Sequence, residues 1–282
     1  MIIPRVPQTA ADVAGHYDEL DEAYRTIWGE HVHHGYWRTG RESPAQATEA
    51  LVELVAGRLA LAPGQRVVDI GCGYGASAAW LAAHHEVAVT GFTLSEAQWR
   101  VAAGRPGALA FHRRDWLDNG LADAAFDRAF AIESSEHMLD KALFFAEAAR
   151  VLKPGGRFVV CAWLARTGAS PREVRHLLEP ICREGRLPGM GTREDYEELA
   201  AAAGLGLLSY EELGPQVRRT WSICARRTAR RLVTDRAFRR LALARTTRNR
   251  SFLLSLPRLM LALRTGAMRY GLFVWEKPPG PI

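Results

Sequence analysis

Residues 67–77, VVDIGCGYGAS, hold an acid and three glycines at alternate positions, Gly71, Gly73 and Gly75. Glycine at such a corner can adopt a positive φ and lets a ligand approach the backbone where a Cβ would otherwise intervene. A helix that begins directly after the corner presents free N–H groups, which favour a carboxylate or another anion. A buried strand with Asp69 at its tip, followed by this corner and a helix, predicts a nucleotide-type binding site.

A second chemically equipped segment is residues 131–145, AIESSEHMLDKALFF. Glu133, Glu136 and His137 place two carboxylates and an imidazole close together, a set that suits proton removal or stabilisation of a developing cation. Under the alternative hypothesis, Glu136 and His137 only orient loops and Glu133 only caps the next helix.

The spacing D-x-G-x-G-x-G resembles the first motif of class I S-adenosylmethionine-dependent methyltransferases and differs from the dinucleotide pattern G-x-G-x-x-G. Three more segments are similar to cyclopropane-fatty-acid-synthase-like and tocopherol-methyltransferase-like enzymes. GFTLSEAQ at 91–98 resembles their GxTLSxxQ, segment 131–145 resembles IESxEHMxDK, and WGEHVHHGYW at 28–37 resembles WGxHxHxGYW. The resemblance extends from about residue 17 to residue 277 and implies S-adenosyl-L-methionine as the cofactor.

The resemblance also implies where the cofactor binds. Most class I enzymes carry an acid after the second strand for the ribose hydroxyls, whereas this chain has Thr93, so Thr93, Gln98 and nearby backbone must bind the ribose. Asp115 lies where the family binds the adenine amino group, and Trp116 could pack on the ring face. The cofactor-binding residues that we expect are Tyr17, Tyr36, Asp69, Gly71, Cys72, Gly73, Gly75, Thr93, Leu94, Gln98, Asp115 and Trp116.

The segment around residue 133 would then lie between cofactor and acceptor. We expect its two acids and its histidine to be catalytic, namely Glu133, Glu136 and His137. A sulfonium methyl is cationic and attracts aromatic faces, so His33, Tyr36 and Trp37, with Tyr17, are expected to close over it. The residues that we expect to contact the acceptor are His33, Trp37 and Trp163.

Strand and helix signals alternate along most of the chain. The strands that we expect are 66–69, 87–92, 108–112, 126–132, 157–163, 205–211 and 271–275. This order predicts an α/β, Rossmann-like, doubly wound and mostly parallel seven-stranded sheet with right-handed crossovers. Ligands bind beyond the carboxyl ends of such strands, so Asp69, Thr93, Asp115 and Glu133 should share one rim.

Four regions are expected: an N-terminal helical cap at 1–60, a Rossmann-like cofactor-binding core at 61–215, an arginine-rich helical lid inserted at 216–268, and a final strand and tail at 269–282. Smaller expectations are a helix over 17–24 and a turn at the Lys-Pro-Gly-Gly sequence of 153–156.

The net charge of +6 hides an uneven distribution. Residues 216–270 hold fifteen arginines and one acid, a local balance of +14, which leaves −8 for the rest of the chain. The favoured interpretation is a solvated helical face; a surface for a diphosphate substrate, an anionic membrane or nucleic acid is the alternative. A diphosphate would require Arg218, Arg219 and Arg226 to face inward, and we favour a neutral acceptor.

Metal sites and disulfides are not expected. Three histidines lie within residues 31–34, but no carboxylate–histidine set follows at ligand spacing, and the resembled family needs no metal. The four cysteines show no CxxC pairing. The chain lacks a signal-peptide pattern and any apolar run near the roughly 18 residues that span a bilayer. We expect a cytoplasmic protein without stable membrane insertion, and a homodimer is left open.

These observations favour an S-adenosylmethionine-dependent methyltransferase with a small, partly apolar acceptor of the natural-product type. The first choice is methylation at carbon of a prenyl, quinol or aromatic compound, and the alternative is methylation at oxygen or nitrogen of a sugar, phenol or amine. A hypothesis of another class is a non-catalytic S-adenosylmethionine-binding module whose basic insert contacts nucleic acid. We expect no nucleic-acid partner, because no aromatic residues interleave the arginines as single-strand binding requires.

Overall fold

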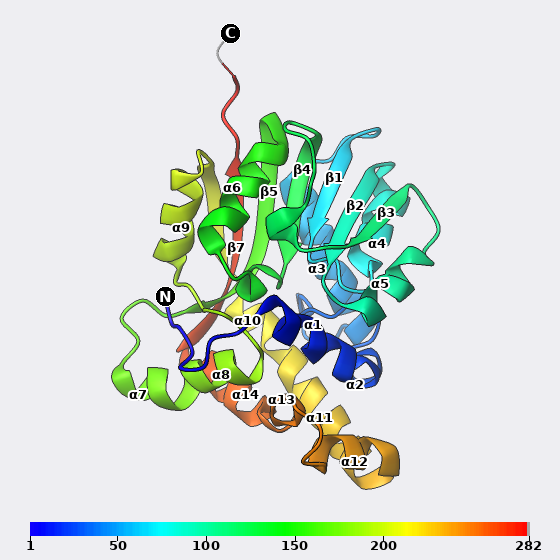
Figure 1. Ribbon diagram of the computed structural model, residues 1–282, viewed down its shortest axis with the longest axis vertical. Helices are drawn as coiled ribbons and strands as arrows, with labels where there is room; N and C mark the ends of the chain where they lie inside the picture. Colours follow the sequence, from blue (N-terminus) through cyan, green and yellow to red (C-terminus); the bar gives the residue numbers. More distant parts are fainter. Residues whose placement is uncertain (281–282) are drawn as a thin grey trace.

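One mixed sheet of seven strands, in the order β3-β2-β1-β4-β5-β7-β6, organises the computed structural model, which describes residues 1–280 (Figure 1). Strands β1 to β5 are parallel to one another, whereas β7 runs antiparallel between β5 and β6. The strands are β1 Arg66–Ile70, β2 Ala88–Thr93, β3 Leu109–Arg113, β4 Phe126–Ile132, β5 Leu152–Ala165, β6 Gly206–Glu212 and β7 Met268–Glu276. The predicted Rossmann-like, mostly parallel sheet is confirmed.

Helices connect the strands and cover both faces of the sheet. They are α1 Ala10–Glu19, α2 Asp21–Ile27, α3 Pro44–Leu59, α4 Ala76–His85, α5 Glu96–Ala103, α6 Lys141–Val151, α7 Pro171–Glu173, α8 Glu179–Glu184, α9 Arg193–Ala202, α10 Gly214–Val217, α11 Arg219–Thr234, α12 Arg236–Leu243, α13 Arg250–Leu254 and α14 Leu256–Thr265. Short 3₁₀ turns lie at η1 Trp116–Asp118 and η2 Ser135–His137, and a π-helical turn, η3 Val174–Leu178, joins α7 to α8.

The alternation of buried side chains along the strands builds two layers of core. On one face, Val67 packs with residues of α3 and α4. On the other face, Val68 packs with residues of α6 and α9. Because successive strand residues point to opposite faces, both positions must be apolar in a sheet that helices cover on both sides.

Two local expectations were wrong. The helix expected over 17–24 is divided at Leu20, which is fully buried between α1 and α2. The sequence of 153–156 belongs to β5, where the pairing with β4 jumps from Phe126–Leu152 to Arg128–Arg157. The proline and the two glycines therefore form an irregularity inside a strand, the usual place for such residues in a sheet.

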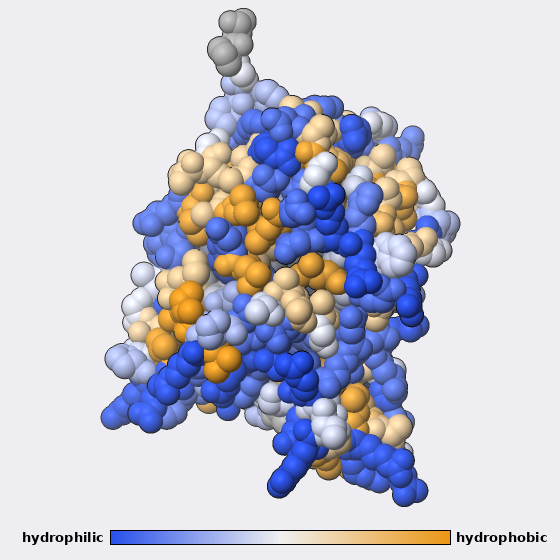
Figure 2. Space-filling view, viewed as in Figure 1, coloured by the Kyte–Doolittle hydropathy of each residue, from blue (hydrophilic) through white to orange (hydrophobic). Residues whose placement is uncertain are grey.

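The cap helices α1 and α2 and the lid helices α10–α14 gather at the carboxyl end of the parallel strands, at the bottom of Figure 1. The lid helices lie between β6 and β7 in the sequence, as predicted. A third buried cluster joins the two groups, with Tyr24 and Ile27 from the cap and Trp221, Phe238 and Phe252 from the lid. Figure 2 shows a mostly hydrophilic lid end at the bottom and apolar surface across the middle of this face, over α6 and beside α1.

Candidate active site

The glycine corner, which we define as Gly71, Gly73 and Gly75, has positive φ at each of these residues. A Cβ on Gly71 would clash with Ser134, and a Cβ on Gly75 would clash with the ring of Phe111, so these two positions serve close packing. A Cβ on Gly73 would meet no atom closer than 3.9 Å. Gly73 is therefore the point at which a ligand can approach the backbone, and Gly75 lies outside the pockets described below.

A pocket opens beside this corner and is called the cofactor pocket. Its walls come from the ends of β1, β2, β3 and β4 and from α1, as the rim argument predicts. Of the expected cofactor-binding residues, the structure brings together Tyr17, Gly71, Gly73, Thr93, Leu94, Gln98, Asp115 and Trp116.

Asp69 lies below the corner in a smaller adjoining cavity, which Gly71, Cys72, Gly73 and His33 also line. Its side chain is buried, and the oxygen Oδ2 has no hydrogen-bond partner within the protein. Burial raises the pKa of the Asp69 carboxyl well above its usual range. A buried carboxylate without a partner is costly unless a ligand supplies a donor, and the ammonium group of S-adenosylmethionine is such a donor.

The side of the pocket where the ribose is expected is built by Thr93 and Gln98. The Thr93 hydroxyl donates to Gln98 Oε1 at 2.8 Å, which leaves the amide nitrogen of Gln98 directed at the open side of Gly73. Ser95 caps α5 by accepting from the Gln98 backbone N–H. The cap at Ser95 leaves the Gln98 side chain free to face the pocket.

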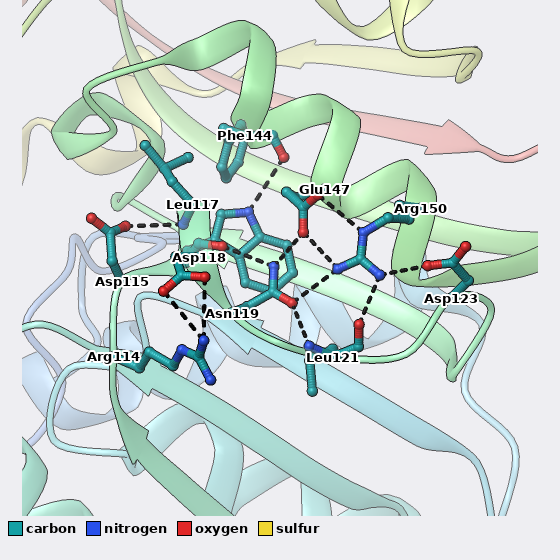
Figure 3. A network of polar contacts seen from close by, with 11 residues as sticks. Arg114, Asp115, Leu117, Asp118, Asn119, Leu121, Asp123, Phe144, Glu147 and Arg150 are labelled. Atoms are coloured by element: carbon teal, nitrogen blue, oxygen red, sulfur yellow. Dashed lines mark hydrogen bonds and ion pairs between the residues drawn. The ribbon is translucent and has the colours of Figure 1, made fainter.

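The side where the adenine is expected is supported by a polar network behind the loop after β3 (Figure 3). Asp115 accepts from the Leu117 backbone N–H at 2.9 Å, and the buried Trp116 indole donates to the Phe144 carbonyl at 3.3 Å. Asn119 donates to the Trp116 carbonyl and to Glu147, which also binds Arg150. This network fixes the loop backbone, so that Asp115 is presented to the pocket in one orientation.

Glu133 lies at the end of β4 with a left-handed φ of 54°, which is unusual for a residue with a side chain. Its carboxylate accepts four hydrogen bonds, from the backbone N–H of His34 at 2.7 Å, His34 Nδ1 at 2.9 Å, Trp163 Nε1 at 2.9 Å and Tyr270 Oη at 2.8 Å. Burial alone would raise the pKa of Glu133, but the charge and hydrogen bonds of His34 outweigh burial and lower it to about 2.

A carboxylate with four donors has no free lone pair for a proton from an acceptor. The expectation that Glu133 performs acid–base chemistry does not fit this geometry, and the residue instead fixes three distant segments around the site. The signal for its partners was present in the sequence as His34 in segment 28–37, but sequence analysis selected the neighbouring His33.

Glu136 follows in η2 and is almost fully buried. Its carboxylate accepts from the Trp163 backbone N–H and from the Ser135 hydroxyl. Burial raises the pKa of Glu136 to about 7. The Lys141 ammonium is also buried and donates to the carbonyls of Glu136 and Met138. These hydrogen bonds stabilise the turn η2.

Tyr17 and His137 form a pair across the site. Tyr17 Oη lies 2.9 Å from His137 Nε2, and His137 Nδ1 lies 3.4 Å from the Arg186 carbonyl. Since a carbonyl only accepts, Nδ1 carries the proton and Nε2 is the acceptor for the Tyr17 hydroxyl. Burial lowers the pKa of His137 to about 4, so the imidazole is neutral near pH 7.

A second cavity, called the acceptor cavity, lies on the far side of this pair. Tyr17, Glu133 and His137 line both the cofactor pocket and the acceptor cavity, so the two spaces meet at these residues. Most of the wall is aromatic, and none of the described residues that line it is lysine or arginine. The lining residues are Tyr17, Tyr24, Trp28, Val32, Glu133, Glu136, His137, Trp163, Gly185, Leu187, Trp221 and Phe252.

The structure does not bring every expected residue to the two spaces. Tyr36 lines none of the pockets described here, and Trp37 is buried and donates its indole N–H to Thr220. His33 contacts Ser77 beside Asp69 and does not reach the acceptor cavity. Trp163 is placed as expected.

Most of the cavity wall was not predicted from the sequence. Trp221 and Phe252 lie in lid helices without a motif, and Trp28, although it opens segment 28–37, was not among the expected site residues. Arg218, Arg219 and Arg226 are exposed and lie outside both spaces, which agrees with the preference for a neutral acceptor.

Neither a metal site nor a membrane-spanning helix is found among residues 1–280. Among residues 1–280, no group of three or more histidine, cysteine, aspartate or glutamate side chains is arranged to hold a metal ion. In the same part of the chain, every helix is too short or too polar to cross a membrane.

The chain is similar to a known protein family and to individual methyltransferases. The family model described as "Mycolic acid cyclopropane synthetase" matches residues 5–240. The chain is 32% identical over 226 residues to 27-O-demethylrifamycin SV methyltransferase of Amycolatopsis mediterranei (strain S699), which covers 78% of this chain and 82% of that protein. It is 28% identical over 291 residues to the chloroplastic tocopherol O-methyltransferase of Arabidopsis thaliana, with coverage of 94% and 82%.

Among solved structures, the [4+2]-cyclase SpnF superposes with a TM-score of 0.79 at 27% identity and covers 99% of this chain and 100% of its own. The same fold therefore occurs in a protein that is named for a cyclisation.

Proposed function

Because this chain belongs to the mycolic acid cyclopropane synthetase family of S-adenosylmethionine-dependent methyltransferases, we propose from that premise that it methylates a hydroxyl oxygen of a neutral, aromatic small molecule. The observation that carries the proposal is the Tyr17–His137 pair, which stands where the cofactor pocket and the acceptor cavity meet. The relatives named as O-methyltransferases support an oxygen acceptor.

The acceptor cavity defines the kind of molecule that fits. Trp28 and Phe252 lie nearly parallel, and the Trp221 indole is close to perpendicular to Trp28 and to Trp163. Flat walls of this kind bind a planar ring by stacking and edge-to-face contact. The absence of cationic side chains from the described wall disfavours a diphosphate group there.

The cofactor supplies an electrophilic methyl group on a cationic sulfur. Tyr17 and His137 hold the acceptor hydroxyl at the boundary of the two spaces, where alignment alone can lower the barrier by several kcal/mol. His137 Nε2, which accepts from Tyr17 in this structure, would accept the hydroxyl proton as the acceptor oxygen bonds to the methyl carbon. The bond between that carbon and the sulfur would break at the same time, and S-adenosylhomocysteine would leave. Glu133 keeps Trp163 in the cavity wall, because its carboxylate accepts from the Trp163 indole.

Methylation at carbon is the second candidate, and one observation favours it. A ring of aromatic side chains with the Glu136 carboxyl beside it also stabilises a cation, which forms when an alkene or an electron-rich ring is methylated at carbon. The proton in that case leaves a carbon atom after the new bond has formed.

The test uses S-adenosylmethionine with a ¹³C-labelled methyl group and a panel of phenols, quinols, prenyl diphosphates and amines. The expected product carries the label as a methoxy carbon, which its ¹³C chemical shift distinguishes from a methyl on carbon or nitrogen. Label found only on carbon selects the second candidate. Transfer must be followed directly, because cofactor binding alone does not separate a methyltransferase from a cyclase of the same fold.

Replacing His137 by Ala tests the base. The expected loss in kcat is roughly 10²- to 10⁴-fold, and binding of S-adenosylhomocysteine should be unchanged. The loss should shrink for nitrophenols, whose hydroxyl is already ionised near neutral pH. An equal loss for ionised and neutral phenols would remove His137 from proton transfer.

Two further parts of the proposal concern the location of the protein and its partners. Four free, buried cysteines fit a reducing compartment, in agreement with a cytoplasmic location. The partner that the site supports is a small, largely apolar acceptor, and a homodimer stays a prediction.

A further inference from the structure

The four acids of residues 18–22, Asp-Glu-Leu-Asp-Glu, divide their contacts between the cofactor-binding core and the lid. We propose that this segment, called the clasp, couples cofactor binding to closure of the lid over the acceptor cavity, so that the cofactor binds first. The inference rests on the proposed function, because it takes the cofactor pocket and the acceptor cavity as the two binding spaces.

Asp18 and Asp21 face the core. Asp18 Oδ1 accepts from the Ser95 hydroxyl and, at 3.0 Å, from the Ala97 backbone N–H. Ser95 lines the cofactor pocket, so Asp18 supports the ribose side of that pocket. Asp21 Oδ1 accepts from the Tyr74 hydroxyl at 2.6 Å, and Tyr74 stands between Gly73 and Gly75 of the glycine corner.

Glu19 and Glu22 face the lid. The two carboxylate oxygens of Glu19 accept from the Arg248 backbone N–H at 2.9 Å and from the backbone and side-chain N–H groups of Asn249 at 2.8 Å each. Glu22 accepts from Arg231 on α11 at 2.9 Å. Some of the lid arginines therefore hold the lid against the cap helices rather than binding a substrate.

Leu20 explains why one short segment can serve both sides. It is fully buried at the break between α1 and α2, in the cluster that also contains Trp221 and Phe252 of the acceptor cavity wall. The break turns the chain between the two acidic pairs. Tyr17, directly before the clasp, belongs to both the cofactor pocket and the acceptor cavity.

The physical consequence is a linkage between two sites. A ligand that orders the glycine corner and the start of α5 favours docking of Asp18 and Asp21, and a docked clasp presents Glu19 and Glu22 to the lid. Because the coupling is a free energy, acceptor binding must strengthen cofactor binding by the same factor. Without the cofactor, the lid should open more often and the acceptor cavity should lose its wall.

Hydrogen exchange of the full-length protein, with and without S-adenosylhomocysteine, tests the coupling and needs no acceptor. In the wild type, the ligand should slow exchange in peptides of α11 and α12 by roughly tenfold. The double variant Glu19→Gln/Glu22→Gln should bind S-adenosylhomocysteine within about twofold of the wild type yet lose the slowing in the lid. The single variant Tyr74→Phe, which removes only the hydroxyl that Asp21 accepts, should weaken ligand binding and lid protection together.

Glu53→Gln is the matched control, since Glu53, on α3, forms an exposed ion pair with Arg38 and its replacement leaves the clasp intact. It should behave as the wild type. Circular dichroism and thermal unfolding establish that each variant is folded, and Glu19→Gln alone serves if the double variant is not. Ligand binding to the wild type without protection of the lid, or full protection in the lid-side variant, would overturn the inference alone. Failure of the wild type to bind S-adenosylhomocysteine would overturn the proposed function as well.

Discussion

Replacing Glu133 by Gln should destabilise the folded protein by about 3 kcal/mol at pH 7. The amide keeps one oxygen but turns an NH₂ group toward two of the four donors that the carboxylate now satisfies. Each buried donor left without a partner costs about 1–3 kcal/mol. The fall in the pKa of Glu133 from 4.5 to about 2 leads independently to about 3 kcal/mol.

The sign of the pH dependence follows from the lowered pKa. Ionised Glu133 stabilises the folded state fully above pH 4.5, and this contribution is lost as the pH falls toward 2. The stability gap between wild type and variant should therefore be constant from pH 6 to 8 and narrow below pH 4.5.

Urea unfolding followed by tryptophan fluorescence measures the gap. With an m-value of about 3 kcal/mol/M, the midpoint should shift by about 1 M. Tyr270→Phe, which removes one of the four donors, is the matched comparison and should cost only about 1 kcal/mol. The double variant should lose less than the sum of the two, because both changes act on the same carboxylate.

A difference below about 1 kcal/mol at pH 7 between wild type and Glu133→Gln, combined with a large loss of turnover, would refute the reasoning. That result would return Glu133 to direct chemistry, as sequence analysis expected.

Three other predictions concern the site. Burial raises the pKa of Glu136 from 4.5 to about 7, so ionisation of Glu136 lowers the free energy of unfolding. Glu136→Gln should therefore stabilise the protein by up to about 3 kcal/mol above pH 7, and this gain should vanish below pH 4.5. Unfolding measurements at pH 8 and pH 4 check both limits. Gly73→Val should remove the micromolar binding of S-adenosylhomocysteine, which is equivalent to roughly −8 kcal/mol, because the valine side chain would enter open pocket space. Unchanged calorimetric binding in the folded variant would contradict the placement of the site. Charge-removing substitutions at Arg218, Arg219 and Arg226 should leave the acceptor KM within about twofold of the wild type, since all three are exposed; a strong rise in KM would reveal an anionic acceptor.

Local sequence determined the sheet and the cofactor side of the site. The glycine corner works through backbone conformation and the space left by a missing Cβ, both of which depend on residue type and on the strand and helix directly beside it. Helix caps at Ser43 and Ser95 are equally local, since each serine side chain accepts from the backbone N–H three residues further on. Parallel strands then bring Thr93 and Asp115 to the same rim without further information.

The tertiary structure decided what the acids do. Glu133 and Glu136 are three residues apart and have the same intrinsic pKa. The charge and hydrogen bonds of His34 lower the pKa of Glu133 to about 2, whereas burial raises the pKa of Glu136 to about 7. The donors to Glu133 come from His34, Trp163 and Tyr270, which are 99, 30 and 137 residues away in the sequence. Charge stabilisation in a protein interior depends on which donors surround the group, and only the folded chain brings those donors together.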